Sequence, residues 1–230
     1  MRILGLIPAR GGSKGIPRKN LAPFAGRPLL QWTCETAREA TRLDALVLST
    51  EDAEIARCGL RWGARVPFMR PAELARDDTP SLPVVQHALE QMDELGEPFD
   101  AVCLLQATNP LRTARDIDAA CTLFERSGAD SVVSVAQIPS HFHPMWAYFR
   151  DDGGLLRQAA GSGVVPRRQE LPPAYFREGS VYVTHRKVVL DLGSLYGERV
   201  VPYVIPPERC GGIDTPEDLR RLEERLHAAV

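Results

Sequence analysis

Residues 8–20 combine the two features that a phosphate-binding loop requires. The run PARGGSKGIPRKN places three glycines and four cationic side chains directly after a short apolar stretch. Glycines allow backbone N–H groups to approach phosphate oxygens, and the cations balance the charge of a polyphosphate. The spacing fits neither GxGxxG nor GxxxxGK[ST], which excludes the usual dinucleotide-binding turn and the Walker A loop. The segment therefore indicates a site for a compact, highly charged anion.

The charge distribution supports this interpretation. No Asp or Glu occurs before Glu35, and the same 34 residues contain six basic side chains. The remaining 22 basic and 30 acidic residues give the rest of the chain a charge of -8. A solvated basic loop is the alternative, but these cations lie among glycines and not along a helix face. The net charge of -2 and pI of about 6.2 indicate neither nucleic-acid nor membrane binding.

The elements that must position this loop follow from an alternation of apolar runs and amphipathic segments. We expect strands at 2–8, 45–50, 101–106, 131–137, 180–185 and 200–206, and helices at 28–42, 52–63, 81–96, 113–128, 186–192 and 215–229. This order predicts a single α/β domain, 1–230, with a mostly parallel, doubly wound sheet. Residues 138–178 are rich in Pro, Gly and aromatics and predict a small irregular or β-rich insertion. Ligands of such sheets lie beyond the carboxyl ends of the strands.

The five cysteines form no CxxC pair, so neither a disulfide framework nor a zinc site is indicated. We therefore expect a reducing, cytoplasmic setting, and the N-terminal run does not resemble a secretory signal. His141 and His143 form an HxH pair that could bind a metal. No third ligand stands near them in the sequence, so surface or dimer-contact histidines are the favoured interpretation.

Several motifs resemble those of the CMP-sialic acid synthetase (acylneuraminate cytidylyltransferase) family. They are IPARGGSKGIPRKN, GRPLL, STEDAEIA, RPAELARDDT, LLQATNPLR and IDTPEDL, which occur in family order from residue 7 to about 225. The resemblance implies a nucleotidyltransferase-like fold and transfer of CMP from CTP to an acidic acceptor, with Mg²⁺ and release of pyrophosphate. It also implies a homodimer in which the region 138–178 crosses to the partner.

The resemblance also assigns residues to the site. Arg10, Lys14 and Lys19 are the predicted catalytic residues, because phosphoryl transfer requires charge stabilisation more than covalent help. The nucleotide is expected to contact Ala9, Arg10, Gly11, Gly12, Ser13, Lys19, Asn20, Arg70 and Ser81. The acceptor is expected to contact Gln106, Arg112, Arg168, Gln169, Tyr175 and Glu178. A surface salt bridge for Arg70 and a loop cap for Gln106 are the alternatives.

Asp214 is the predicted Mg²⁺ ligand, with N-capping before Thr215 as its alternative role. Relatives commonly carry Asp-x-Asp here, whereas this chain has Gly212-Ile213-Asp214. Water, CTP or another carboxylate would then complete the coordination, or metal binding is weaker. Asp77 and Asp78 could supply a second carboxylate pair, although opening the helix at 81 is the favoured role.

The acceptor side departs from the family in two further places. Glu178 stands where relatives have asparagine, and LDLGSL at 190–195 lacks the aromatic residues expected there. Glu51 replaces an aspartate, which is a milder change. We therefore expect N-acetylneuraminate to be a poor acceptor, and another nonulosonic acid or a small phosphonic acid to be a better one. A catalytically weak nucleotide-binding homologue and a nucleotidyltransferase for another base remain the rival hypotheses.

Overall fold

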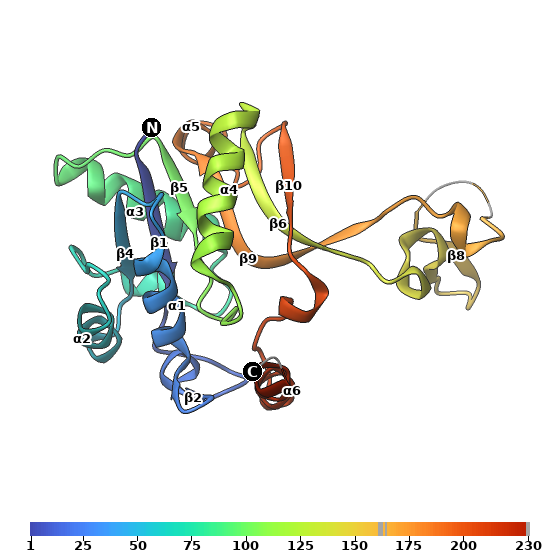
Figure 1. Cartoon of the computed structure of the whole chain (residues 1–230), viewed down its shortest axis with the longest axis horizontal. Coiled ribbons are helices and arrows are strands. Elements are labelled where there is room, and N and C mark those ends of the chain that lie inside the picture. The colour runs from blue at the N-terminus through green and yellow to red at the C-terminus, as the bar shows by residue number, and fades with distance from the viewer. Residues whose placement is uncertain (161–162, 164, 229–230) are drawn as a thin grey trace.

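A six-stranded sheet in the order β10-β6-β9-β5-β1-β4 forms the centre of the molecule (Figure 1). The computed structural model describes residues 1–160, 163 and 165–228. The strands are β1 Ile3–Pro8, β4 Ala45–Ser49, β5 Ala101–Leu104, β6 Ser131–Gln137, β9 Tyr175–His185 and β10 Val200–Val204. All run parallel except β9, which is antiparallel to both of its neighbours. The expected mostly parallel α/β fold is confirmed.

Helices cover both faces of the sheet because the strand residues alternate between two apolar cores. The helices are α1 Leu29–Glu39, α2 Ala53–Arg61, α3 Ser81–Glu94, α4 Ala114–Ser127, α5 Arg186–Leu190 and α6 Pro216–Ala228. Apolar residues of α1, α2 and α4 pack on one face, and those of α3 and α5 pack on the other. Among the residues described, no helix is long and apolar enough to span a bilayer.

The antiparallel direction of β9 follows from the insertion that precedes it. The described residues between β6 and β9 form no crossover helix; instead the chain leaves the body as a long arm and returns beside its outgoing path (Figure 1). The tip of the arm contains an antiparallel pair, β7 Tyr148–Arg150 and β8 Leu156–Gln158. Strand β9 is therefore longer than the predicted 180–185, because its first residues form one side of the neck of the arm.

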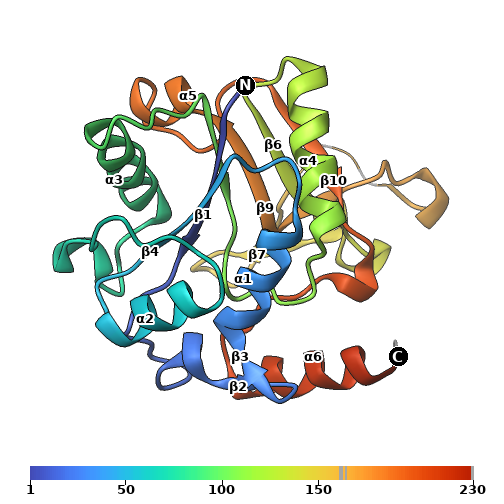
Figure 2. The ribbon, with the colours of Figure 1, turned by 60° about the vertical axis from the view of Figure 1, so that its left-hand side comes forward.

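A third, smaller core fastens the C-terminal helix beneath the glycine-rich loop. Phe24, Leu29, Ile213 and Leu222 are buried together with Ile16. Figure 2 shows α6 beside a short hairpin, β2 Pro23–Phe24 and β3 Arg27–Pro28, which the sequence analysis did not predict. The hairpin turns through Ala25 and Gly26, both at positive φ, as in a type I′ turn.

The helix boundaries reflect local hydrogen bonds. Thr215 and Asp218 exchange the capping-box bonds expected before α6. Helix α1 ends at Glu39 and not at 42 as predicted, because the backbone N–H groups of Thr41 and Arg42 donate to Asp118 of α4. The 3-10 turns are Lys19–Leu21, Ala72–Ala75, Ser140–Phe142, Pro144–Trp146, Arg168–Glu170 and Pro207–Arg209.

Candidate active site

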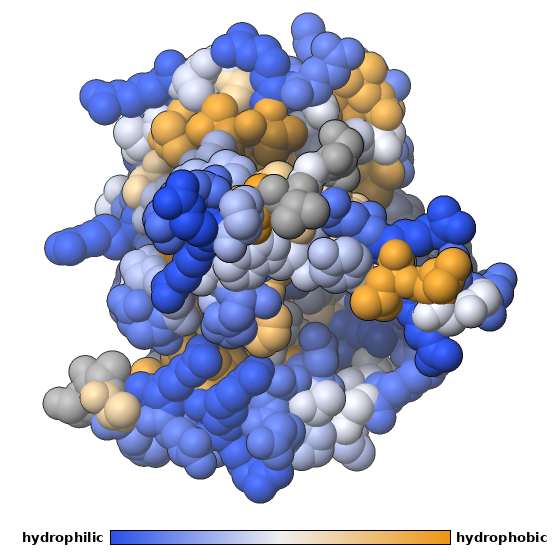
Figure 3. All heavy atoms as spheres, turned by 90° about the vertical axis from the view of Figure 1, so that its right-hand side faces the viewer, coloured by the Kyte–Doolittle hydropathy of each residue, from blue (hydrophilic) through white to orange (hydrophobic). Residues whose placement is uncertain are grey.

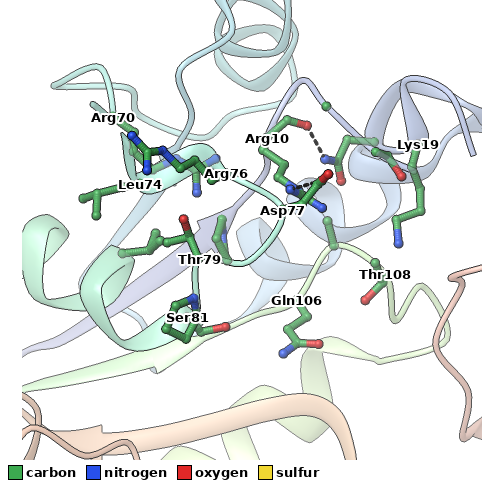
Figure 4. Close-up of a pocket in the computed structure, with 17 residues that line it drawn as sticks. Arg10, Lys19, Arg70, Leu74, Arg76, Asp77, Thr79, Ser81, Gln106 and Thr108 are labelled. Carbon is green, nitrogen blue, oxygen red and sulfur yellow. Dashed lines mark hydrogen bonds and ion pairs between the residues drawn. The ribbon is translucent and has the colours of Figure 1, made fainter. Parts of the chain in front are cut away.

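A pocket of about 220 Å³ lies beyond the carboxyl ends of β1 and β5, where the fold predicts a ligand (Figure 4). The glycine-rich loop forms one wall, and residues 70–84 form the opposite wall. Eight of the predicted site residues line it: Arg10, Gly12, Ser13, Lys19, Asn20, Arg70, Ser81 and Gln106. The structure therefore brings together seven of the predicted nucleotide residues, from the loop and from residues 70–81, with Gln106, which was predicted for the acceptor.

The glycine-rich loop is anchored at both of its ends. The Asn20 side-chain amide donates to the Arg10 carbonyl at 2.9 Å, and Lys19 Nζ donates to the Ile213 carbonyl at 2.9 Å. Glycine is required at Gly15, since a Cβ atom there would lie 2.1 Å from the Asp214 carbonyl oxygen. The loop is therefore held against the segment that carries the predicted metal ligand.

Each predicted catalytic cation pairs with a carboxylate in this structure. Asp77 contacts Arg10 at 2.5 Å and Lys14 at 3.2 Å, and Lys19 contacts Asp214 at 2.7 Å. Hydrogen bonds from Lys14 and Arg10 lower the pKa of Asp77. The N-cap position of α3 is Pro80, so the expectation that Asp77 opens this helix is wrong. Asp77 instead forms ion pairs with Arg10 and Lys14, two of the cations that are expected to bind phosphates.

Arg70 and Glu51 form the other end of the pocket. Arg70 is only 5% exposed, which excludes its alternative role in a surface salt bridge. One Arg70 guanidinium nitrogen donates to Glu51 at 2.8 Å, and the buried Nε has no partner in the described residues. Glu51 therefore holds the Arg70 guanidinium at this end of the pocket.

A second pocket, of about 710 Å³, adjoins the first and shares Gln106 and Thr108 with it. Glu178 and Asp214 line this second pocket. Gln106 therefore lies at the junction of the two pockets.

Glu178 is buried for a structural reason that the sequence did not reveal. Val133 pairs with Tyr182 and Val135 with Arg177, so Ser134 faces a bulge at residues 178–181. Within that bulge the Glu178 carboxylate accepts hydrogen bonds from the backbone N–H and the hydroxyl of Ser180. The neighbouring Gly179 has φ +92°, which favours glycine. The carboxylate thus stabilises the bulge as well as lining the pocket.

Three predicted contacts differ from the structure. Arg112 is buried and donates to the carbonyls of Gln106 and Ser180 and to the Thr33 hydroxyl, so it supports the strand ends and does not face an acceptor. Burial lowers the pKa of Arg112 to about 10. The N–H groups of Ala9 and Gly11 donate to Ser49 and Glu51, so neither is available to phosphates in this structure.

The remaining acceptor residues lie on the arm. Arg168 lines a separate pocket at the neck, with residues 137–143 and 171–174, and Gln169 and Tyr175 are exposed. Arg168 therefore does not join Gln106 within one chain. His143 is buried and its Nε2 contacts the Pro172 carbonyl, as a structural residue of the neck.

Arg177 and Tyr196 are site residues that the sequence analysis missed. Both line a small pocket that also contains Ser81, Gln106 and Tyr182. Arg177 donates to the Tyr196 hydroxyl, and its guanidinium carbon lies 5.1 Å from the centre of the Tyr196 ring. Tyr196 directly follows the run 190–195, which lacks aromatic residues, and supplies an aromatic ring to this pocket.

Asp214 offers one exposed carboxylate for a metal ion, with 79% of its side chain accessible. Asp218 accepts hydrogen bonds from Thr215 and therefore does not replace the acidic residue missing at Gly212. Within the described ranges no three acidic, His or Cys residues form a metal cluster. One carboxylate beside a phosphate pocket nevertheless fits Mg²⁺, which often takes its other ligands from substrate phosphates and water.

Comparisons with known proteins agree with this geometry. Residues 4–147 match the cytidylyltransferase family model. The pseudaminic acid cytidylyltransferase of Campylobacter jejuni is 32% identical, over 95% of this chain and 94% of that protein. N-acylneuraminate cytidylyltransferase A of Danio rerio is 32% identical over 97% of this chain and 50% of that protein.

A solved structure shows the same fold. CMP:2-keto-3-deoxy-manno-octonic acid synthetase, complexed with CTP, superimposes with a TM-score of 0.74 and 17% identity over 100% of both chains. This likeness confirms the expected nucleotidyltransferase-like architecture, and the family model and the curated relatives confirm the expected enzyme class. On its motifs, its fold and its relatives, the chain belongs to the cytidylyltransferase family, together with the acylneuraminate enzymes.

Proposed function

We propose that this enzyme transfers CMP from CTP to a nonulosonic acid and releases pyrophosphate. The observation that carries the proposal is the junction of two pockets at Gln106 and Thr108. In the proposed reaction an acceptor hydroxyl oxygen attacks the α-phosphorus, the bond to the pyrophosphate oxygen breaks, and the hydroxyl proton leaves to solvent. Holding the two reactants in line supplies much of the rate enhancement in such transfers.

The glycine-rich loop would bind the triphosphate and stabilise the departing pyrophosphate. Arg10 and Lys19 supply positive charge along one wall of the pocket, and Ser13 adds a hydroxyl. Lys14 lies beside the pocket, where it contacts Asp77. Asp77 must release Arg10 and Lys14 when the triphosphate binds. The polyphosphate then replaces one carboxylate with several anionic oxygens, so the exchange favours the ligand electrostatically.

We propose Mg²⁺ as the cofactor, with Asp214 as its protein ligand. Asp214 lies beside Lys19 and lines the second pocket, close to where the phosphates and the acceptor would meet. When bound, the ion would neutralise charge on the nucleotide phosphates. Lys19 would then exchange its contact with Asp214 for contacts with phosphate oxygens.

We further propose a homodimer in which the arm of one copy reaches the other. About half of the exposed large hydrophobic side chains among the described residues lie on the arm and its neck. They are Phe142, Tyr148, Phe149, Leu155, Leu156, Tyr175 and Phe176. Figure 3, which views the molecule from the side of the arm, shows hydrophobic side chains exposed on this face. Such a surface favours burial against a second copy, which would bring Arg168 toward the partner's acceptor pocket.

The cytoplasm is the proposed location, because the five cysteines are free thiols, as expected in a reducing compartment. Relatives named for pseudaminic and N-acylneuraminic acids favour a nonulosonic acceptor over a small phosphonic acid.

The test is pyrophosphate release with CTP, Mg²⁺ and a panel of acceptors. We expect release with at least one nonulosonic acid, and a higher kcat/KM for pseudaminate than for N-acetylneuraminate. Release only with phosphonic acids would assign the alternative acceptor. No release with any acceptor, despite CTP binding, would support the catalytically weak homologue instead. A thermal-shift series with CTP, UTP, ATP and GTP identifies the base, because a ligand that binds the native state raises Tm.

A further inference from the structure

A single carboxylate, that of Glu51, connects the two ends of the nucleotide pocket. One of its oxygens accepts a hydrogen bond from the Gly11 backbone N–H at 2.7 Å, and the other accepts from Arg70 at 2.8 Å. Gly11 belongs to the phosphate-binding loop, whereas Arg70 lies at the opposite end of the pocket. In the described residues Glu51 is thus shared between two parts that the sequence separates by almost 60 positions.

The backbone around Glu51 is fixed on both sides. Thr50 is buried, and its carbonyl accepts the Arg70 backbone N–H at 2.9 Å. Asp52 caps α2 through hydrogen bonds from the N–H groups of Glu54 and Ile55. The position of the Glu51 carboxylate is therefore set by its neighbours, and its two partners must adapt to it.

The burial of Arg70 makes this contact important. A guanidinium that is 95% buried requires an anionic partner, and Glu51 is the carboxylate that contacts it. The bond to Glu51 occupies one terminal nitrogen of the guanidinium, and Arg70 lines the pocket. Glu51 therefore fixes the orientation in which the guanidinium lies at the pocket wall.

We propose that Glu51 is a positioning residue that holds Arg70 and the glycine-rich loop in one register, so that nucleobase and triphosphate are bound together. This inference rests on the proposed function, since it assumes that Arg70 contacts the base of CTP. Glu51 touches no ligand itself and acts through its two partners.

The test compares two ligands in four proteins. Dissociation constants for CTP and for inorganic tripolyphosphate are measured by calorimetry in the parent, Glu51→Gln, Arg70→Lys and the double variant. In Glu51→Gln the amide oxygen can still accept from Gly11 but the amide nitrogen cannot accept from Arg70. We expect the Kd for CTP to rise about tenfold, as for loss of one charged hydrogen bond, and the Kd for tripolyphosphate to stay within about twofold.

The double variant separates positioning from a general structural role. If Glu51 acts through Arg70, the double variant binds CTP about as weakly as Arg70→Lys alone. Additive losses, or equal losses for both ligands, would overturn the proposal, and so would an unchanged Kd for CTP in Glu51→Gln. Glu97→Gln is the matched control, because Glu97 also pairs with an arginine, Arg65, but outside the pocket and the glycine-rich loop.

Two further comparisons keep the result decisive. If Glu51→Gln does not fold, Glu51→Asp replaces it, because aspartate retains the charge but is too short to reach both partners. The proposal then expects about a threefold loss of affinity for CTP alone. Equal losses of affinity for CTP and tripolyphosphate would contradict it. A parent protein that does not bind CTP would contradict the proposed function. Equal Kd values for CTP in the parent and in Glu51→Gln would contradict only this inference.

Discussion

The glycine-rich loop, on the proposed donor side, and the arm, on the proposed acceptor side, differ in how the chain holds them. The loop is tied to other elements by Asn20, Lys19 and the Gly11–Glu51 contact, and a small core supports it from below. The arm projects from the body and exposes aromatic and cationic side chains (Figure 1). The proposed donor side is therefore preorganised within one chain, whereas the proposed acceptor side would be completed by a second copy.

The largest effect is expected on the donor side. Lys19→Ala removes a cation that the structure holds against the phosphate pocket, and we expect turnover to fall by at least ~10²-fold, as when a transition-state donor is lost. Pyrophosphate release measures the effect, and circular dichroism checks the fold. Lys187→Ala, an exposed lysine of α5, is the control. Turnover near the parent value in Lys19→Ala would show that the loop does not contribute to catalysis.

A smaller and more selective effect is expected on the acceptor side. Arg177→Gln removes a guanidinium that lines the second pocket and the small pocket with Tyr196, each of which also contains Gln106. We expect KM for the acceptor to rise about tenfold while KM for CTP stays within about twofold, because one charged hydrogen bond is lost. Steady-state kinetics with each substrate varied in turn measures both values. An equal rise in both KM values would show that the two sides are not separate.

The metal contribution can be strengthened at Gly212. This residue does not have a positive φ, and the nearest atom to an added Cβ, Asn109 Oδ1, lies at 3.9 Å. Gly212→Asp should therefore fold normally and lower the Mg²⁺ concentration for half-maximal turnover about fivefold, since a second carboxylate favours the ion. A titration of turnover with Mg²⁺ tests this. An unchanged midpoint would argue against a metal site beside Asp214.

The smallest effect is expected at Asp77. Asp77→Asn removes the carboxylate that occupies Arg10 and Lys14, so tripolyphosphate should bind about threefold more tightly, as for loss of one exposed ion pair. Calorimetry measures the change, and Asp78→Asn is the adjacent control. Weaker binding in Asp77→Asn would mean that Asp77 helps to hold the ligand.

The same contrast explains which features were predictable from sequence. The glycine-rich loop and the alternating elements are encoded in contiguous runs, and the structure places them as local patterns predict. The supporting role of Arg112 and the hydrogen bonds of Glu178 were not predictable, because both depend on the bulge of β9 opposite Ser134, which is a tertiary feature. Arg177 was missed because its place beside Gln106 depends on the long-range pairing of β9 with β6.

Contacts between residues far apart in the sequence were also not predictable from local patterns. Asp77 and Arg10 are separated by 67 positions, and Glu51 and Gly11 by 40, so no local period links them. The hairpin at residues 23–28 is too short to produce a strand pattern. Sequence reasoning therefore found the donor side largely from local motifs, and found the acceptor side chiefly through family resemblance.

In the proposed homodimer, one chain supplies the donor side and a second copy completes the acceptor side. Coexpression of Lys19→Ala with Arg168→Ala tests it most directly. Each variant alone should be nearly inactive. In mixed dimers, one intact loop meets one intact arm, and random pairing should restore about one quarter of parent pyrophosphate release. Pyrophosphate release no greater than the sum of that of the two variants alone would contradict a shared site between the two copies.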